Sequence, residues 1–249
     1  MTKGVDPDAV SRSVERLRAE DLAAGELASS LRTVIEATGV VFAADGAGVM
    51  LVDEQQALHF VGATDARSAA FEAAQEETGE GPCVDSLVHD MNVWTADLAH
   101  DPRWPNLSEQ VGALGIRAIL GVPLHLGLTP VGSLNVYHFE PREWVDDDVR
   151  AIEAHSRILE ELLGLAMLAR QSTTIVDQLT RALRHRVVIE RAVGVVMATE
   201  GLDPVRAFDR LRRQARSSRR RVADVAADLL AEPRFSHDIR PPSDGEGPA

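Results

Sequence analysis

Two adjacent runs rich in valine, leucine and isoleucine constrain the fold of this chain most strongly. Residues 117–127 read RAILGVPLHLG, residues 129–139 read TPVGSLNVYHF, and the two runs meet at a Gly-Leu-Thr-Pro turn. Runs of strand length separated by a turn of this composition predict a β-hairpin. Because both runs are so rich in strand-forming apolar residues, we expect the hairpin at the centre of a sheet.

The segments before this hairpin alternate between helical and extended patterns. The predicted helices span 6–43, 66–78 and 108–115, and the predicted strands span 49–53, 58–64 and 91–98. Helices and strands mixed in this order predict an α+β domain, in which helices cover an antiparallel sheet.

A long helical pattern follows, from residue 146 to about residue 199, without a proline. Its apolar residues form one stripe, interrupted by a polar patch at 171–174: Val149, Ile152, Leu159, Leu163, Ala166, Ile175, Leu179, Leu183 and Val187. A long stripe on a narrow face is typical of a helix that pairs with a second copy of itself. We therefore expect a homodimer through helix 146–199.

Two shorter helices are predicted after Gly201. Asp203 followed by Pro204 is a typical helix start, which predicts a helix over 203–215. Ser217 and Ser218 are expected to form a turn before a third helix at 219–231. The remaining residues, 232–249, are polar and rich in proline and glycine, so we expect a disordered tail.

The charge of the chain is divided unevenly. The whole chain carries −13, yet residues 174–231 contain 12 arginines, no lysine and seven acidic residues, a local net charge of +5. Eight of these arginines are candidate ligands for an anionic partner: Arg206, Arg210, Arg212, Arg213, Arg216, Arg219, Arg220 and Arg221. Arginine binds phosphate bidentately and stacks on bases, which favours a nucleic acid over a merely solvated face.

The predicted packing leaves these arginines free of the core. Ala207, Phe208, Leu211 and Ala215 share one face of helix 203–215 and should be buried, with arginines along both flanks. Three arginines at the start of the third helix oppose the positive end of its dipole. A phosphate backbone would offset that cost.

Residues 191–230 resemble the ANTAR domain, a three-helix RNA-binding module of bacterial transcription antiterminators. The resemblance rests on matching residues in each helix: Ala192, Gly194, Met197, Ala207, Phe208, Leu211, Arg212, Ala215, Val222, Val225 and Ala226. It implies a dimeric protein that binds paired stem-loops in nascent mRNA and prevents a terminator from forming. Val193 stands where the family often has lysine, which leaves the RNA contacts to the second and third helices.

Residues 20–165 are similar to a GAF domain, a sensor module found at the front of bacterial regulators. The stretches DGAGVMLVD, EGPCVDSL, TADLAHDPRWP, GIRAILGVPL and VGSLNVY carry the similarity, which also extends to actinobacterial proteins in which GAF precedes ANTAR. This resemblance implies either a sensor domain with a small-molecule ligand or a domain that only supports dimerisation. The sequence does not identify the ligand, because the Asn-Lys-Phe-Asp-Glu signature of cyclic-nucleotide binding is not found.

Three side chains are candidate sensor residues. Cys83 is the only thiol, either a redox or electrophile sensor or a bilin attachment point, or else an ordinary buried cysteine. Trp94 and Trp104 either line a pocket or fill the core. The histidines lack metal-ligand spacing, so no metal site is predicted, and no cofactor is assigned.

The resulting domain plan has five parts: a helical extension (1–19), a GAF-like domain (20–165), a helical linker (166–175), an ANTAR module (176–231) and a tail (232–249). An enzyme is not expected, since catalytic motifs are missing and a thiol-based reductase would need a second cysteine. DNA binding and a protein-only switch, in which the arginines dock on acidic residues, remain as alternatives. Without an apolar span or a signal peptide, we expect a cytoplasmic protein.

Overall fold

The computed structural model describes residues 4–53, 58–169, 173–218 and 220–231, and the side chains of His185 and Arg216 are not described. The chain divides into two compact units, Met1–Leu183 and Arg184–Ala249. The predicted tail, 232–249, and Arg219 lie outside the described residues.

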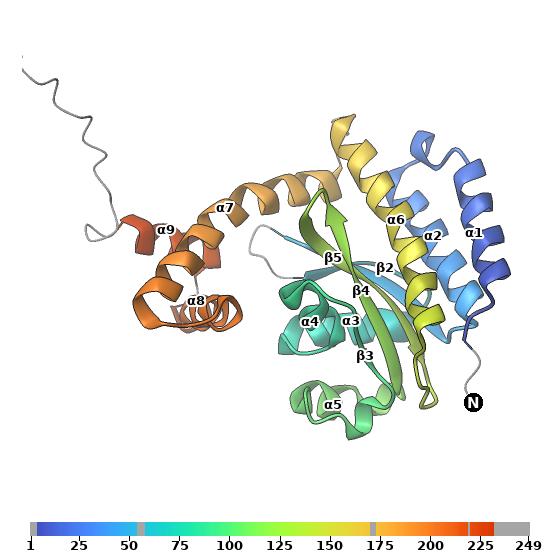
Figure 1. The fold of residues 1–249 in the computed structure, drawn as a ribbon, viewed down its shortest axis with the longest axis horizontal. Coiled ribbons are helices and arrows are strands. Elements are labelled where there is room, and N and C mark those ends of the chain that lie inside the picture. Colours follow the sequence, from blue (N-terminus) through green and yellow to red (C-terminus); the bar gives the residue numbers. More distant parts are fainter. Residues whose placement is uncertain (1–3, 54–57, 170–172, 219, 232–249) are drawn as a thin grey trace, which may run out of the picture. The chain divides into compact units, whose positions relative to one another are not determined.

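A five-stranded antiparallel sheet forms the centre of the first unit (Figure 1). Its strands are β1 (Gly46–Val52), β2 (Leu58–Ala63), β3 (Val93–Thr95), β4 (Ala118–Leu126) and β5 (Thr129–His138), in the order β2-β1-β5-β4-β3. The predicted hairpin is confirmed as β4 and β5. At its turn, Gly127 has a φ of +66°, which favours glycine. The third strand is shorter than the predicted 91–98.

Helices cover both faces of the sheet. The helices that lie wholly or partly in the first unit are α1 (Pro7–Ala19), α2 (Leu27–Phe42), α3 (Ala66–Thr78), α4 (Pro82–His89), α5 (Pro105–Val111), α6 (Asp146–Leu168) and α7 (Thr174–Glu200), with short 3-10 turns η1 (Leu22–Ala24), η2 (Leu98–His100) and η3 (Gly112–Leu114). Helices α2 and α6 pack on one face, with α1 outside them, whereas α3 and α4 pack on the other (Figure 1). The predicted α+β class is confirmed.

The alternation of side chains along the central strands separates the two faces. On β4, Leu120 and Leu124 join the core beneath α2 and α6, while Ile119 joins a second apolar cluster with α3 and α5. On β5, Leu134 and Val136 likewise face α2 and α6. Because the side-chain period of a strand is two, the residues between them necessarily face α3 and α4.

The N-terminal helical pattern is interrupted, so the prediction of one helix over 6–43 is wrong. Backbone at Glu20 is extended, which ends α1, and η1 follows before α2 begins. The Ser30 hydroxyl donates to the carbonyl of Leu22 at 2.7 Å and holds this corner. The break lets α1 and α2 each pack against α6, which a single helix could not do. Helix α5 also starts earlier than the predicted residue 108.

The long helix predicted over 146–199 is two helices. Helix α6 ends at Leu168, and the Thr173 hydroxyl caps the start of α7 by accepting from the Val176 amide at 3.2 Å. Threonine is a favoured cap because its oxygen satisfies an otherwise unpaired N–H group. Of the polar patch at 171–174, Thr173 and Thr174 form the start of α7, and residues 170–172 lie outside the described residues.

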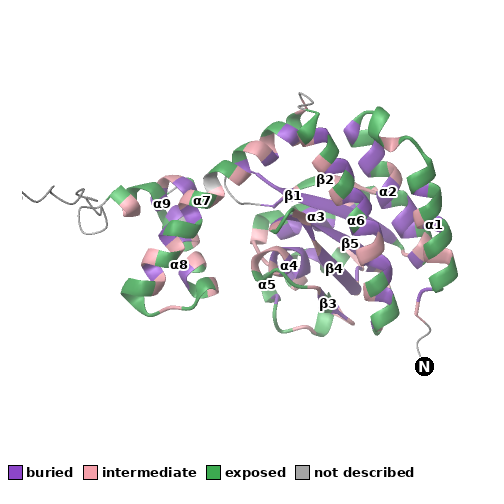
Figure 2. Cartoon of the chain, turned by 45° about the horizontal axis from the view of Figure 1, so that its top comes forward, coloured by how far each residue is buried: buried purple, intermediate pink, exposed green. Residues whose placement is uncertain are grey.

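Most of the apolar stripe on α6 and α7 lies in the core of its own domain (Figure 2). Ile152, Leu159 and Leu163 are completely buried, and Leu179 is 1% exposed. Val187 is the exception, at 51% exposed. A buried stripe cannot pair with a second copy, so the predicted dimer interface along helix 146–199 is wrong for these residues. The sheet needed this apolar face as its cover.

Truncating the stripe tests this assignment. We expect Leu159→Ala to lower the free energy of unfolding by about 2–5 kcal/mol, because it leaves a cavity in the core. The matched control is Leu168→Ala, the same change on the same helix at a side chain 82% exposed. It should cost less than about 0.5 kcal/mol. Denaturant unfolding measures both, and equal losses would contradict the assignment.

Candidate functional site

The second unit has a small apolar core formed by side chains of α7 and of the two helices that follow it. Helix α8 (Pro204–Ser218) buries Ala207, Leu211 and Ala215 completely or nearly so, and α9 (Val222–Ala231) packs against it. Phe208 is partly buried in the same cluster. The predicted core face of α8 is confirmed, and the arginines consequently lie on its flanks.

The two ends of α8 differ in how well the sequence predicted them. As expected, Asp203 caps the start, accepting from the Arg206 amide at 2.9 Å. The predicted turn at Ser217–Ser218 is wrong: both hydroxyls donate to the Gln214 carbonyl, and the helix continues through them. Helix α9 begins only at Val222. Arg220 and Arg221 therefore precede α9 and do not occupy its first turn.

The described arginines of the candidate set are accessible to a partner. Side-chain exposure is 76% for Arg206, 36% for Arg210, 45% for Arg220 and 46% for Arg221. Arg213 is exposed, and Arg212 lies 5.8 Å from the centre of the Phe208 ring. The side chain of Arg216 and all of Arg219 lie outside the described residues.

Four of these arginines form ion pairs inside their own module. Arg206 lies 3.6 Å from Asp203, and Arg210 lies 2.8 Å from Glu200. Arg220 lies 2.7 Å from Asp228, which raises the pKa of its guanidinium through their hydrogen bond. Arg221 donates to both carboxylate oxygens of Asp224, at 2.9 and 3.0 Å. Ion pairs this exposed add little to stability, and the guanidinium groups remain accessible to solvent.

A buried polar cluster occupies the sheet face beneath α3 and α4, and sequence analysis missed it. The carboxylate of Glu72 on α3 accepts from Asn135 Nδ2 and Gln75 Nε2, both at 2.9 Å, and contacts the Tyr137 hydroxyl and the Cys83 thiol. All five side chains are fully buried. The available signal was the alternation of Ser133, Asn135 and Tyr137 in an otherwise apolar strand.

Neighbouring glycines make room for this cluster. A Cβ on Gly48 of β1 would lie 2.7 Å from Glu72 Oε1, and a Cβ on Gly121 of β4 would lie 2.8 Å from Asn135 Oδ1. Both separations are shorter than real contacts allow. The two glycines thus belong to the polar cluster as much as its hydrogen-bonding groups do.

Burial sets the protonation of the cluster. Desolvation raises the pKa of Glu72 to about 8 against three hydrogen bonds that lower it. Burial, followed by the nearby Glu72 charge, raises the pKa of the Cys83 thiol. A thiol held protonated is a poor nucleophile. The environment of Cys83 is thus that of an ordinary buried cysteine, and a sensor role for it stays a prediction.

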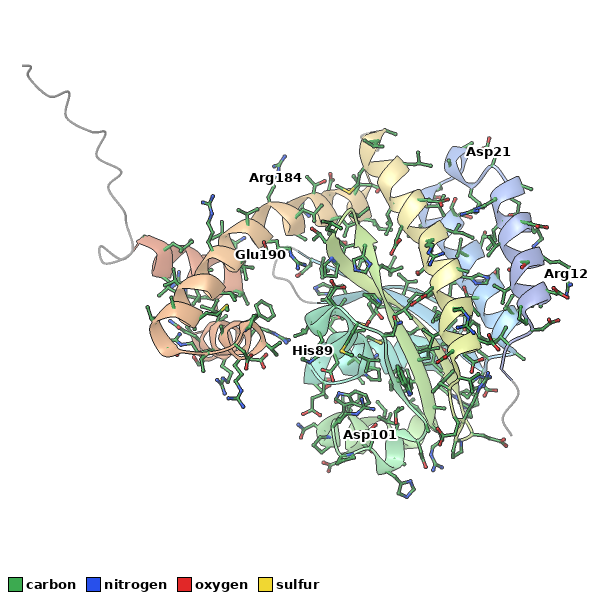
Figure 3. The ribbon with its side chains drawn as sticks, viewed as in Figure 1. Arg12, Asp21, His89, Asp101, Arg184 and Glu190 are labelled. Carbon is green, nitrogen blue, oxygen red and sulfur yellow. The ribbon has the colours of Figure 1, made fainter. Side chains whose placement is uncertain are left out.

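The two candidate tryptophans occupy different environments. Trp104 is 2% exposed, donates to Asp85 Oδ2 at 2.9 Å and lies beneath the Arg103 guanidinium. Trp94 is 46% exposed and lines an open cleft of about 500 Å³ with His89, Met91, Asn92 and Arg103. Figure 3 labels His89 on α4 and Asp101, the ion-pair partner of Arg103. Neither Cys83 nor Trp104 lines this cleft.

Metal-binding clusters and membrane-spanning helices are both absent from the described part of the chain. There, no three His, Cys, Asp or Glu side chains gather closely enough to hold a metal ion. None of the helices described has both the length and the apolar character to cross a bilayer.

An α+β domain followed by a small helical module with an arginine surface defines a two-domain protein. Residues 26–163 match the GAF domain family, and residues 177–230 match the ANTAR domain family. Since the GAF match covers more than half of the chain, the chain belongs to the GAF domain family. With its second match, it is a GAF- and ANTAR-domain regulator.

Solved structures show the same fold at low sequence identity. The chain is similar to the GAF domain of a phosphoenolpyruvate-protein phosphotransferase from Coxiella burnetii, with a TM-score of 0.53, 16% identity, and coverage of 65% of this chain and 96% of that one. The chain is also similar to free methionine-R-sulfoxide reductase from Neisseria meningitidis, with a TM-score of 0.52 and 16% identity. That similarity covers 68% of this chain and 97% of the reductase. These similarities establish the fold alone. No curated protein matches the chain.

Thiol labelling tests the burial of Cys83. In the folded chain we expect Cys83 to react with an aromatic disulfide reagent on the order of 100-fold more slowly than in denaturant, because the thiol is buried and its pKa is raised. Since it is the only cysteine, the absorbance change reports this residue directly. Equal labelling rates in the folded and unfolded chain would refute the assignment.

The raised pKa of Glu72 predicts a pH-dependent stability. The carboxyl ionises near 4.5 in the unfolded chain but only near 8 when folded, so folding takes up a proton between these pH values. The free energy of unfolding should fall as pH rises from about 5 to 8, by at most about 1.4 kcal/mol per pH unit. Denaturant titrations at each pH measure it. Glu72→Gln should flatten the dependence, and an unchanged slope would contradict it.

Proposed function

We propose that this protein is a transcription antitermination regulator whose ANTAR module binds stem-loops in nascent mRNA under control of its GAF domain. The carrying observation is the set of exposed guanidinium groups on α8 and at residues 220–221. A-form stems present phosphates to such groups, and loop bases accept hydrogen bonds and stacking from arginine. Binding to a stem-loop prevents the competing terminator hairpin from forming.

The surface of α9 favours RNA over duplex DNA. A helix that reads the major groove needs several exposed polar side chains along its length. Here Val222, Ala223, Val225 and Ala226 are buried, and the exposed positions include Ala227 and the acidic Asp228. A surface of small side chains with few exposed polar groups offers few contacts to the base edges of a major groove.

The GAF domain supplies the signal in this proposal. The cleft beside Trp94 offers an exposed aromatic face and the polar side chains of Asn92 and His89 to a small molecule. Paired stem-loops need two ANTAR modules, so the proposal includes a homodimer. The dimer interface must lie outside the buried stripe. Leu165 and Leu168 of α6 are exposed and available to such an interface. We propose no catalytic role for this protein and a location in the cytoplasm, where the transcripts are.

An arginine substitution tests RNA binding. Arg213→Ala should weaken binding to an RNA of two short stem-loops and reduce the slope of log affinity against log salt by about one, because one phosphate contact is lost. Arg32→Ala is the matched control, since Arg32 is equally an exposed helical arginine but lies on α2. Fluorescence anisotropy of labelled RNA over a salt series measures both.

The same assay separates the alternative functions. We expect wild-type protein to bind the stem-loop RNA more tightly than a DNA duplex of equal length and salt. Tighter binding to the duplex would support a DNA-binding regulator instead. No binding to either nucleic acid at low salt would favour a protein-only switch.

A further inference from the structure

The acidic residues of the second unit are placed against its arginines. Asp224 and Asp228 lie on α9, and both reach back to the residues that precede that helix. Asp228 comes eight positions after Arg220, yet their charged atoms are 2.7 Å apart. Asp224 takes both donors of one edge of the Arg221 guanidinium.

These carboxylates use the same donors that a phosphate would use. A guanidinium presents a planar fork that suits one bidentate anion on an edge. When that edge is occupied by a carboxylate, a phosphate must displace it, and the displaced carboxylate remains close and repels the phosphate. Both pairs are accessible to this exchange, because Asp224 is 38% exposed and Asp228 is 65% exposed.

We propose that Asp224 and Asp228 are internal counter-anions which RNA phosphates must displace from Arg221 and Arg220, so that these two carboxylates limit the affinity of the module. This inference rests on the proposed RNA binding and adds residues that oppose it. An RNA that places several phosphates on this surface at once overcomes the competition. A single strand or an isolated phosphate does not.

Of the two acids, Asp228 gives the cleaner test. Asp224 lies in the first turn of α9, where a negative charge also stabilises the helix dipole, so neutralising it weakens the helix. Asp228 lies beyond that turn and is mostly exposed. Its substitution therefore changes the partner of Arg220 with little effect on the helix.

The experiment compares two variants of the full chain with equal charge change. Asp228→Asn releases Arg220, whereas Asp209→Asn on α8 removes an exposed acid that forms no ion pair with any side chain the structure describes. With the two-stem-loop RNA, we expect Asp228→Asn to bind about two- to five-fold more tightly at low salt, with a steeper salt dependence. For Asp209→Asn, we expect an increase in the logarithm of RNA affinity that is less than half of the increase for Asp228→Asn.

A conservative variant and the wild type complete the design. Asp228→Glu keeps the charge and should bind like the wild type, while thermal unfolding should show that all variants fold. Equal gains from Asp228→Asn and Asp209→Asn would show a general charge effect and overturn the inference, as would no gain from either. Wild-type protein that binds no RNA would overturn the proposed function itself, a result distinct from equal variants.

Discussion

The burial of the β4–β5 hairpin on both faces is the constraint on which the rest of the first unit depends. A central hairpin has two surfaces to cover, and the helices on either side are placed by that need. One surface is apolar and takes α2 and α6. Helix α6 must therefore turn its apolar stripe toward the sheet. The face of α6 that resembles a coiled-coil seam is thus buried in the core.

The opposite surface of the hairpin carries a polar cluster in place of a second apolar layer. Ser133, Asn135 and Tyr137 point from β5 toward Glu72 and Cys83, and every described donor there has an acceptor within the cluster. Such a cluster is satisfied only with its partners in register, since an unpaired buried carboxylate is costly. Its hydrogen bonds join α3 to the sheet and α4 to α3. Because it contains the carboxyl of Glu72, the cluster also makes stability depend on pH.

In the second unit, charge and packing are separated in a simpler way. Small apolar residues allow α8 and α9 to pack closely, which leaves the arginines on the flanks and in the connection between the helices. The acids of the same unit are interleaved with these arginines. The module thus has a positive surface whose strength is moderated locally, although residues 174–231 as a whole carry +5.

The sequence by itself determined the elements whose signals are local. Two apolar runs of strand length and the Gly-Leu-Thr-Pro turn between them predicted the central hairpin, the Asp203–Pro204 start predicted α8, and the arginine content predicted the basic surface. The tertiary structure decided which surfaces those elements bury. The α6 stripe could have faced a partner or the sheet, and Glu72 meets Asn135, 63 residues away, only because the sheet and α3 bring them together. Ion pairs such as Arg220–Asp228 were equally out of reach, because local periodicity carries no information about contacts formed by packing.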